Sequence, residues 1–222
     1  MPFDGITMNV VKKELENLLV NSRVDKIYQP HKETIILKFR THSSNPRLLL
    51  SCKADSAGIH LVDKQPENPK QPPVFCMVLR KYLENGKLIS IEQQGLERIL
   101  TFKFQSVNEA GSLKHLALYC EIMGKHSNIV LVDTETGCIL DGAKRFTHEV
   151  NRYREVFPGI PYVLPPSQNK SNFLTMTEEQ FYSLMLSQPL DRKLPEILLT
   201  ILEGFSPLLC QETIIRAGLP QD

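Results

Sequence analysis

Apolar residues near the start of the chain recur every three or four positions, at Met8, Val11, Leu15, Leu18 and Leu19. This period is typical of an amphipathic helix that turns one face to a core. It predicts a helix over residues 5–20. Asp4 directly precedes that helix, and a short carboxylate side chain at this position can cap the first free backbone N–H groups.

Short apolar runs bounded by turn-forming residues follow, and they predict strands. These runs cover residues 24–29, 34–40, 47–52, 59–61, 88–93, 98–105, 116–122, 129–132 and 138–141. The sixth and seventh runs predict a hairpin, and so do the last two. The proline-rich residues 63–73 predict a stiff surface loop. Residues 74–85 have the apolar period of a helix, with Gly86 as its C-cap.

The pattern changes in the last third of the chain. Four prolines within residues 158–166 predict the exit from a first domain. Thr177 and Gln180 fit a capping box at the start of a helix, and residues 194–203 and 207–217 predict two more helices. The sequence therefore predicts an α+β fold, with antiparallel strands and packed helices over residues 1–170 and a small all-α segment over residues 173–222.

Five polar side chains fall within eight residues between two strand-like runs, at Glu121, Lys125, His126, Ser127 and Asn128. A strand that only fills a core alternates and then turns at Gly or Pro, whereas this stretch crosses one Gly and becomes apolar again. Two interpretations stay open. The stretch is a polar strand end or bulge that presents groups to a partner, or it is a solvated hairpin crossing.

Composition sets only broad limits on function. The 222 residues are 41% hydrophobic and 23% charged, as in ordinary soluble globular proteins. The net charge of +1 means that nucleic-acid binding must depend on local basic patches. The five cysteines include no pair at metal-ligand spacing, and their odd number favours a reducing, cytoplasmic compartment. We expect no signal sequence, no membrane span, no metal and no cofactor.

Charged residues at predicted turns and helix starts are candidates for binding. Asp4 is a helix cap, a functional carboxylate or both. Glu97 and Arg98 precede a predicted strand, either as two exposed turn charges or as a pair in which Arg98 contacts phosphate or a base edge. Three basic pairs are solvated faces or, if they converge, a phosphate-contacting surface: Arg80 with Lys81, Lys144 with Arg145, and Arg152 with Arg154.

The sequence gives little support to catalysis. His126 and Ser127 are neighbours on a predicted strand, so their side chains point to opposite faces and do not form a nucleophile–base pair. The sequence contains no nucleophile elbow, P-loop, dinucleotide fingerprint or zinc-protease motif. We therefore do not expect an enzyme.

Several separated motifs, in order along nearly the whole chain, resemble the NFACT family. They are Phe3-Asp4-Gly5, Arg23-Val24-Asp25-Lys26-Ile27-Tyr28-Gln29-Pro30, the run from Pro72 to Leu83, Gly95-Leu96-Glu97-Arg98-Ile99, residues 121–128, Asn151-Arg152-Tyr153-Arg154 and the run from Pro158 to Pro166. The resemblance is strongest to the bacterial branch, which older naming calls fibronectin-binding proteins. It implies an N-terminal fragment: the NFACT-N domain and the start of a helix-hairpin-helix region.

The resemblance also implies a function. Members bind large ribosomal subunits that are obstructed by a peptidyl-tRNA on a stalled nascent chain, and they recruit tRNA for untemplated C-terminal tailing. The bacterial branch adds alanine, which points to alanine tRNA. The expected location is cytoplasmic and ribosome-associated. The alternative is a fibronectin-binding adhesin displayed on the surface without a signal peptide.

Site residues follow from the same motifs. Asp4 and Arg98 match the family's acidic residue and its Asp-Arg pair, and Glu97 stands where Asp is usual. Together with Glu121 and Ile122 they are expected to recognise tRNA. Arg80, Lys81, Lys125, His126 and Asn128 are candidates for further RNA contacts. For His126 and Asn128 two interpretations stay open: they touch RNA, or they hydrogen-bond the strand end in place.

NFACT-N resembles the N-terminal domain of formamidopyrimidine-type DNA glycosylases, which implies a sandwich-like or barrel-like sheet arrangement. Pro2 stands where those enzymes place their nucleophilic proline. Phe3 stands where they need a catalytic Glu, and no zinc-finger cysteine pattern follows. The resemblance therefore implies a shared fold without glycosylase chemistry.

Overall fold

The computed structural model describes residues 3–64, 66–107, 111–147, 153–189 and 191–219. Contacts between residues divide the chain into two compact units. The helical unit consists of Met1–Val10, Gln94–Arg98 and Pro166–Asp222, and the sheet unit consists of Val11–Gln93 and Ile99–Pro165. Each unit is described by itself below. The division falls between Pro165 and Pro166, within the proline-rich stretch, and it assigns the N-terminal segment and the short segment Gln94–Arg98 to the helical unit.

The sheet unit is built on one antiparallel sheet of nine strands in the order β4-β3-β2-β1-β5-β6-β7-β8-β9. The strands are β1 (Arg23–His31), β2 (Thr34–Arg40), β3 (Arg47–Ser51), β4 (Gly58–Val62), β5 (Lys87–Gln93), β6 (Ile99–Val107), β7 (Leu113–Glu121), β8 (Asn128–Asp133) and β9 (Ile139–Gly142). The expected α+β class and both expected hairpins, β6 with β7 and β8 with β9, are confirmed.

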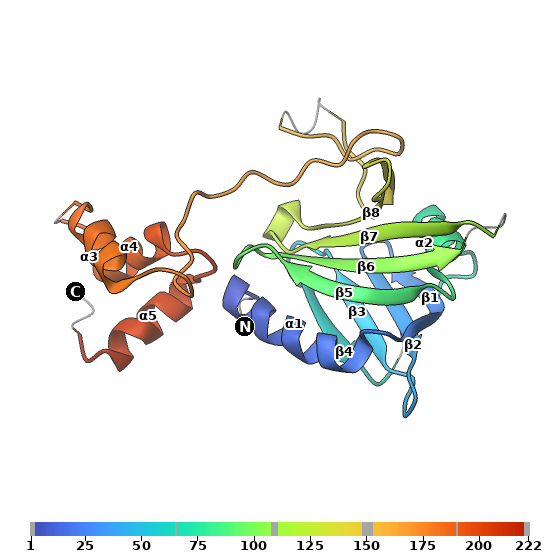
Figure 1. Ribbon diagram of the computed structural model, residues 1–222, viewed down its shortest axis with the longest axis horizontal. Helices are drawn as coiled ribbons and strands as arrows, with labels where there is room; N and C mark the ends of the chain where they lie inside the picture. The colour runs from blue at the N-terminus through green and yellow to red at the C-terminus, as the bar shows by residue number, and fades with distance from the viewer. Residues whose placement is uncertain (1–2, 65, 108–110, 148–152, 190, 220–222) are drawn as a thin grey trace. The chain divides into compact units, whose positions relative to one another are not determined.

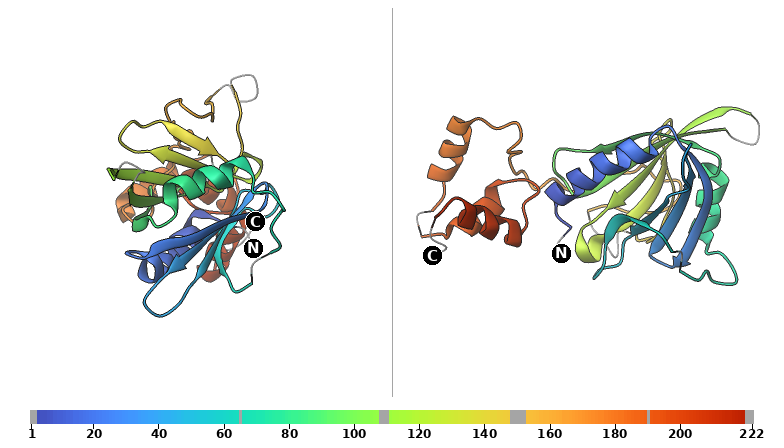
Figure 2. Two further views of the ribbon diagram at one scale, coloured as in Figure 1. Left: turned by 90° about the vertical axis from the view of Figure 1, so that its right-hand side faces the viewer. Right: turned by 90° about the horizontal axis from the view of Figure 1, so that it is seen from below.

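The sheet divides into two layers because β1 and β5 pair at a single position, Arg23 with Lys87. Figure 1 shows β5, β6 and β7 in one layer, with β1 to β4 crossing behind them. Helix α2 (Val74–Leu83) contacts β1, β6 and β9, and in the left view of Figure 2 it lies between the two layers. The largest buried side chains, Phe39, Phe102 and Phe104, come from both layers.

Helix α2 ends earlier than its apolar period predicts. It stops at Leu83, Glu84 is its C-cap, and Asn85 adopts a positive φ of 65°. The Gly86 C-cap prediction is therefore wrong. Asn tolerates the left-handed region better than most residues, so Asn85 makes the turn and Gly86 follows it. A Cβ on Gly86 would lie 2.9 Å from the Leu83 carbonyl oxygen.

Helix α1 (Gly5–Leu19) begins in the helical unit and continues into the sheet unit. The rest of the helical unit contains α3 (Glu178–Leu186), α4 (Leu194–Ile201) and α5 (Pro207–Arg216). The expected capping box at Thr177 and Gln180 is present in both directions. The core of this unit is small: Ile197, Leu198, Ile201, Leu202, Cys210 and Ile214. Among the residues described, no helix has the length and apolar character needed to cross a membrane.

Candidate functional site

Asp4 links the starts of two helices within the helical unit. Its Oδ1 accepts the Thr7 N–H at 2.8 Å, which confirms its expected role as the cap of α1. Its Oδ2 accepts the Ser206 hydroxyl at 2.8 Å. Ser206 in turn caps α5 by accepting the Leu209 N–H at 3.3 Å. The carboxylate therefore lies at the positive ends of two helix dipoles, and both Asp4 and Ser206 are buried.

Three backbone segments meet at this point without room for side chains. The Gly5 N–H donates to the Gly204 carbonyl at 3.1 Å. A Cβ on Gly5 would lie 1.9 Å from the Leu96 carbonyl oxygen, and a Cβ on Gly204 would lie 2.7 Å from Leu96 Cβ. Leu96 itself is buried. We call Asp4, Gly5, Leu96, Gly204 and Ser206 the Asp4 junction. Its close packing fixes the backbone of the segment that carries Glu97 and Arg98.

Glu97 and Arg98 lie in a turn between β5 and β6. The Glu97 N–H donates to the Gln94 carbonyl at 3.0 Å, and Gly95 has the positive φ of 55° that the turn requires. Both charged side chains are half-buried. The Arg98 guanidinium makes no ion pair or hydrogen bond with the residues that the structure describes. An ordered backbone with an unpaired guanidinium suits bidentate recognition of phosphate or a base edge.

Glu121 is fully buried at the end of β7 in the sheet unit, where it holds Arg154 and Tyr162. Its Oε1 accepts Arg154 Nη1 at 2.8 Å and the Tyr162 hydroxyl at 2.7 Å, and its Oε2 accepts Arg154 Nη2. Arg154 Nη1 also donates to the Val163 carbonyl at 3.0 Å. Burial and the neighbouring Glu121 carboxylate raise the pKa of Tyr162 well above its usual value. We call this group the Glu121 ion pair.

The other polar residues of this stretch lie where the chain crosses from β7 to β8. Lys125 and His126 are exposed there, whereas Ser127 and Asn128 are buried. A 3-10 turn, Gly124–His126, connects β7 to β8. Ser127 accepts the Met123 N–H at 2.8 Å. Asn128 is fully buried: it donates to the Lys144 carbonyl at 2.9 Å and accepts the Lys144 N–H at 3.0 Å. The expectation that Asn128 contacts RNA directly is corrected, because the segment around Lys144 already uses its amide.

The other expected RNA contacts differ in exposure. Lys125, His126 and Lys81 are exposed. Arg80 is partly held in place, since its Nε donates to the Ile27 carbonyl at 3.0 Å. Ile122 is 3% exposed and belongs to the core. Glu121 and Ile122 are therefore both buried and expose almost no surface to a partner. Pro2 and Arg152 lie outside the described residues.

Two important residues were missing from the predicted site. Ser206 is followed by Pro207 at the first turn of α5, and a Ser-Pro pair of this kind is a recognisable helix start. Its bond to Asp4 spans 202 residues and could not be found from local pattern. Tyr162 stacks on Tyr119 with ring centroids 4.1 Å apart. No sequence signal connects Tyr162 to Glu121.

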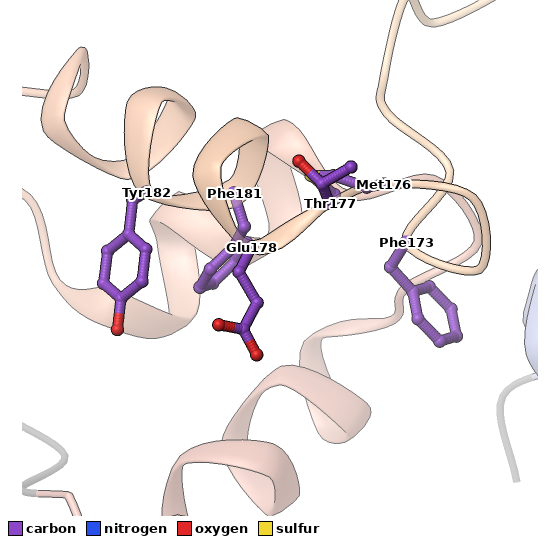
Figure 3. Close-up of a pocket in the computed structure, with 6 residues that line it drawn as sticks. All are labelled: Phe173, Met176, Thr177, Glu178, Phe181 and Tyr182. Atoms are coloured by element: carbon purple, nitrogen blue, oxygen red, sulfur yellow. The ribbon is translucent and has the colours of Figure 1, made fainter.

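The helical unit also carries a shallow hollow of about 360 Å³ with a mixed apolar and polar lining. Figure 3 shows the side chains of Phe173, Glu178 and Tyr182 pointing to the same side of this segment, beside Met176, Thr177 and Phe181. Within the described part of the chain, no three His, Cys, Asp or Glu side chains gather as metal ligands do.

Two features define the class of protein. One is the antiparallel sheet of nine strands, and the other is the helical unit, in which the turn with Arg98 packs against the Asp4 junction. Residues 4–222 match the family described as NFACT N-terminal and middle domains, and the chain belongs to this family.

Individual relatives resemble the chain over almost its whole length. It is 39% identical to the Rqc2 homolog RqcH of Bacillus subtilis over 99% of this chain and 38% of that protein. It is 28% identical to the human ribosome quality control complex subunit NEMF, over 97% of this chain and 19% of that protein. The crystal structure of the N-terminal domain of fibronectin-binding protein PavA from Streptococcus pneumoniae superposes with a TM-score of 0.90 at 36% identity, covering 98% of this chain and 81% of that one. The chain thus spans well under half the length of RqcH and NEMF.

Proposed function

We propose that this chain is the N-terminal part of a ribosome quality control factor. The factor binds large ribosomal subunits that hold a peptidyl-tRNA, and it recruits tRNA, with alanine tRNA as the expected choice, to extend the stalled nascent chain without a template. Family membership supports this proposal, because relatives named for ribosome quality control, in Bacillus subtilis and in human, match 97% or more of the chain. The factor acts in the cytoplasm, on the ribosome.

The observation that carries the site assignment is the unpaired Arg98 on the Asp4 junction. We propose that Arg98 and Glu97 contact the tRNA and that Asp4 holds them in place through Gly5 and Leu96. Lys81, Lys125 and His126 supply contacts to phosphate. The Glu121 ion pair and Ile122 stabilise the end of β7, which is followed by the exposed Lys125 and His126. The chain performs no bond-breaking step in this proposal, and ribosomal RNA carries out peptidyl transfer.

A tailing assay tests this proposal. The full-length protein is expressed in cells that lack their own copy, and alanine tails are measured on a reporter without a stop codon. We expect the Arg98→Ala variant to lose tails while its abundance is unchanged. The exposed Lys64, in the sheet unit, provides a matched control, since Lys64→Ala also removes one positive charge. Wild-type tailing by Arg98→Ala would remove Arg98 from the site.

Fibronectin binding is the second candidate, because the similar solved domain of PavA is named for that activity. It requires display outside the cell. A titration of immobilised fibronectin with the purified chain tests it directly. Saturable binding that excess unlabelled chain displaces would support adhesion, whereas a signal that rises linearly with concentration would remove this candidate.

A further inference from the structure

A cleft of about 410 Å³ lies in the sheet unit. Three segments line it: the first residues of α2, the turn between β1 and β2, and residues 141–145 around the end of β9. Gln29 on β1 also lines it. None of the expected tRNA-binding residues belongs to this lining.

The cleft has uncompensated positive charge. Helix α2 has ten residues, Pro73 as its N-cap, no side-chain cap and no acidic residue in its first turn. Its first N–H groups are therefore available to an anion. Lys32 is exposed, and its ammonium has no partner among the described residues.

The two carboxylates of the lining are already paired. Arg145 Nε and Nη2 both donate to Asp141 at 2.8 Å, and Lys144 Nζ lies 3.3 Å from Glu33 Oε1. Lys144 Nζ also donates to the Cys52 carbonyl at 2.6 Å. The α2 N-terminus and Lys32 are thus the parts of the lining that attract an anion.

Gln29 provides an independent sign of a ligand. It is 3% exposed, and its Nε2 donates to the Lys32 carbonyl at 2.8 Å. Its Oε1 is buried and accepts no hydrogen bond from the described residues. A buried acceptor without a donor is costly. Since Gln29 lines the cleft, a ligand that brings a hydroxyl to this acceptor would satisfy it once the side chains that cover the atom have moved.

We propose that this cleft binds the ribose-phosphate unit of RNA. The phosphate oxygens accept from the first N–H groups of α2 and from Lys32, and the ribose 2′-hydroxyl donates to Gln29 Oε1. A 2′-hydroxyl next to a phosphate supplies the donor and the negative charge together, and it distinguishes RNA from DNA. The inference rests on the proposed RNA-binding function and adds a second, sugar-specific contact to it.

The test compares affinities for RNA and DNA. A short fluorescein-labelled single-stranded RNA and the DNA of the same sequence are titrated with the chain, and fluorescence anisotropy is recorded at several salt concentrations. In the Gln29→Met variant we expect RNA affinity to fall about fivefold, the size of one net hydrogen bond, with DNA affinity unchanged. Lys32→Met should lower the affinities for RNA and DNA equally. It should also reduce the slope of log affinity against log salt concentration by about the amount of one phosphate contact.

The RNA-to-DNA affinity ratio keeps the test independent of folding, because a loss of folded protein lowers both affinities together. Lys64→Met, outside the cleft, should leave both affinities unchanged. Adenosine monophosphate and its 2′-deoxy form serve as competitors of the labelled RNA. Stronger competition by the ribonucleotide would support the site and would show that a single nucleotide is enough to occupy it. An unchanged ratio in Gln29→Met overturns the inference alone. Absence of RNA binding by the wild-type chain counts against the proposed function itself.

Discussion

The Glu121 ion pair makes a prediction that separates a structural role from direct contact with RNA. Glu121 and Arg154 are 0% and 6% exposed, and the carboxylate accepts three hydrogen bonds from Arg154 and Tyr162. The Glu121→Gln variant keeps the size of the side chain but leaves the Arg154 guanidinium buried without a counter-charge. Removing one partner of a buried pair costs about 3–5 kcal/mol of unfolding free energy.

Removing both charges should cost less than removing one. In the double variant Glu121→Gln with Arg154→Met, no buried charge is left uncompensated, so part of the loss is recovered. Tyr162→Phe removes one bond to the carboxylate, whose Oε1 still accepts from Arg154, and should cost about 1.5 kcal/mol. Lys125→Gln, exposed in the same polar stretch, should change stability by less than about 0.5 kcal/mol.

Urea unfolding of the 222-residue chain measures these differences. The chain contains no tryptophan, so far-ultraviolet circular dichroism follows the loss of the sheet. RNA binding is measured on the same samples at low urea. The structural role of Glu121 is refuted if the Glu121→Gln variant loses less than about 1 kcal/mol of unfolding free energy but no longer binds RNA.

Three further predictions concern packing, pH and thiol reactivity. Gly5→Ala places a methyl group against the Leu96 carbonyl oxygen, so it should lower the free energy of unfolding by about 2–3 kcal/mol or prevent folding of the Asp4 junction. In the control variant Gly137→Ala the added Cβ meets nothing within 4 Å but φ is 70°, and the loss should be about 1 kcal/mol. Equal losses of stability in thermal unfolding would contradict the packing argument. The pKa of Tyr162 is raised in the folded chain, because burial and the Glu121 carboxylate disfavour the phenolate. The neutral Tyr162 therefore contributes its full share of folding stability below the unfolded pKa of about 10, and this share is lost as pH rises above that value. Between neutral and alkaline pH, the Tyr162→Phe variant should lose less stability than the wild type. Cys138 is the one partly exposed thiol of the five, and burial raises the pKa of Cys52 to about 12, so brief iodoacetamide treatment followed by mass spectrometry should find Cys138 modified first.

Much of the fold was predictable because its signals are local. The period of α1, the Asp4 cap, the Thr177 capping box and the two hairpins all depend on residues within a few positions of one another. The division of the sheet into two layers was not predictable in this way, because it depends on the single β1–β5 pair at Arg23 and Lys87. The end of α2 was misplaced because Asn85, and not Gly86, adopts the positive φ.

The members of the candidate site were selected from motifs, whereas their contacts in the structure were not predictable from the sequence. Asp4 and Arg98 could be selected from motifs, whereas the Ser206 hydroxyl that holds Asp4 is 202 residues away. Asn128 was a candidate RNA contact because it lies in the polar stretch that resembles a family motif. Its amide instead fastens the Lys144 segment, and a sequence pattern cannot distinguish a buried, satisfied polar group from an exposed one.

The central claim is that Arg98, held by the Asp4 junction, recruits tRNA to obstructed large ribosomal subunits. The most direct measurement is the tRNA content of large subunits purified with full-length protein, wild type against Arg98→Ala, at increasing salt. We predict that wild-type complexes contain recruited tRNA, that high salt releases it, and that Arg98→Ala complexes contain the obstructing peptidyl-tRNA alone. Equal amounts of recruited tRNA in both complexes would contradict the claim.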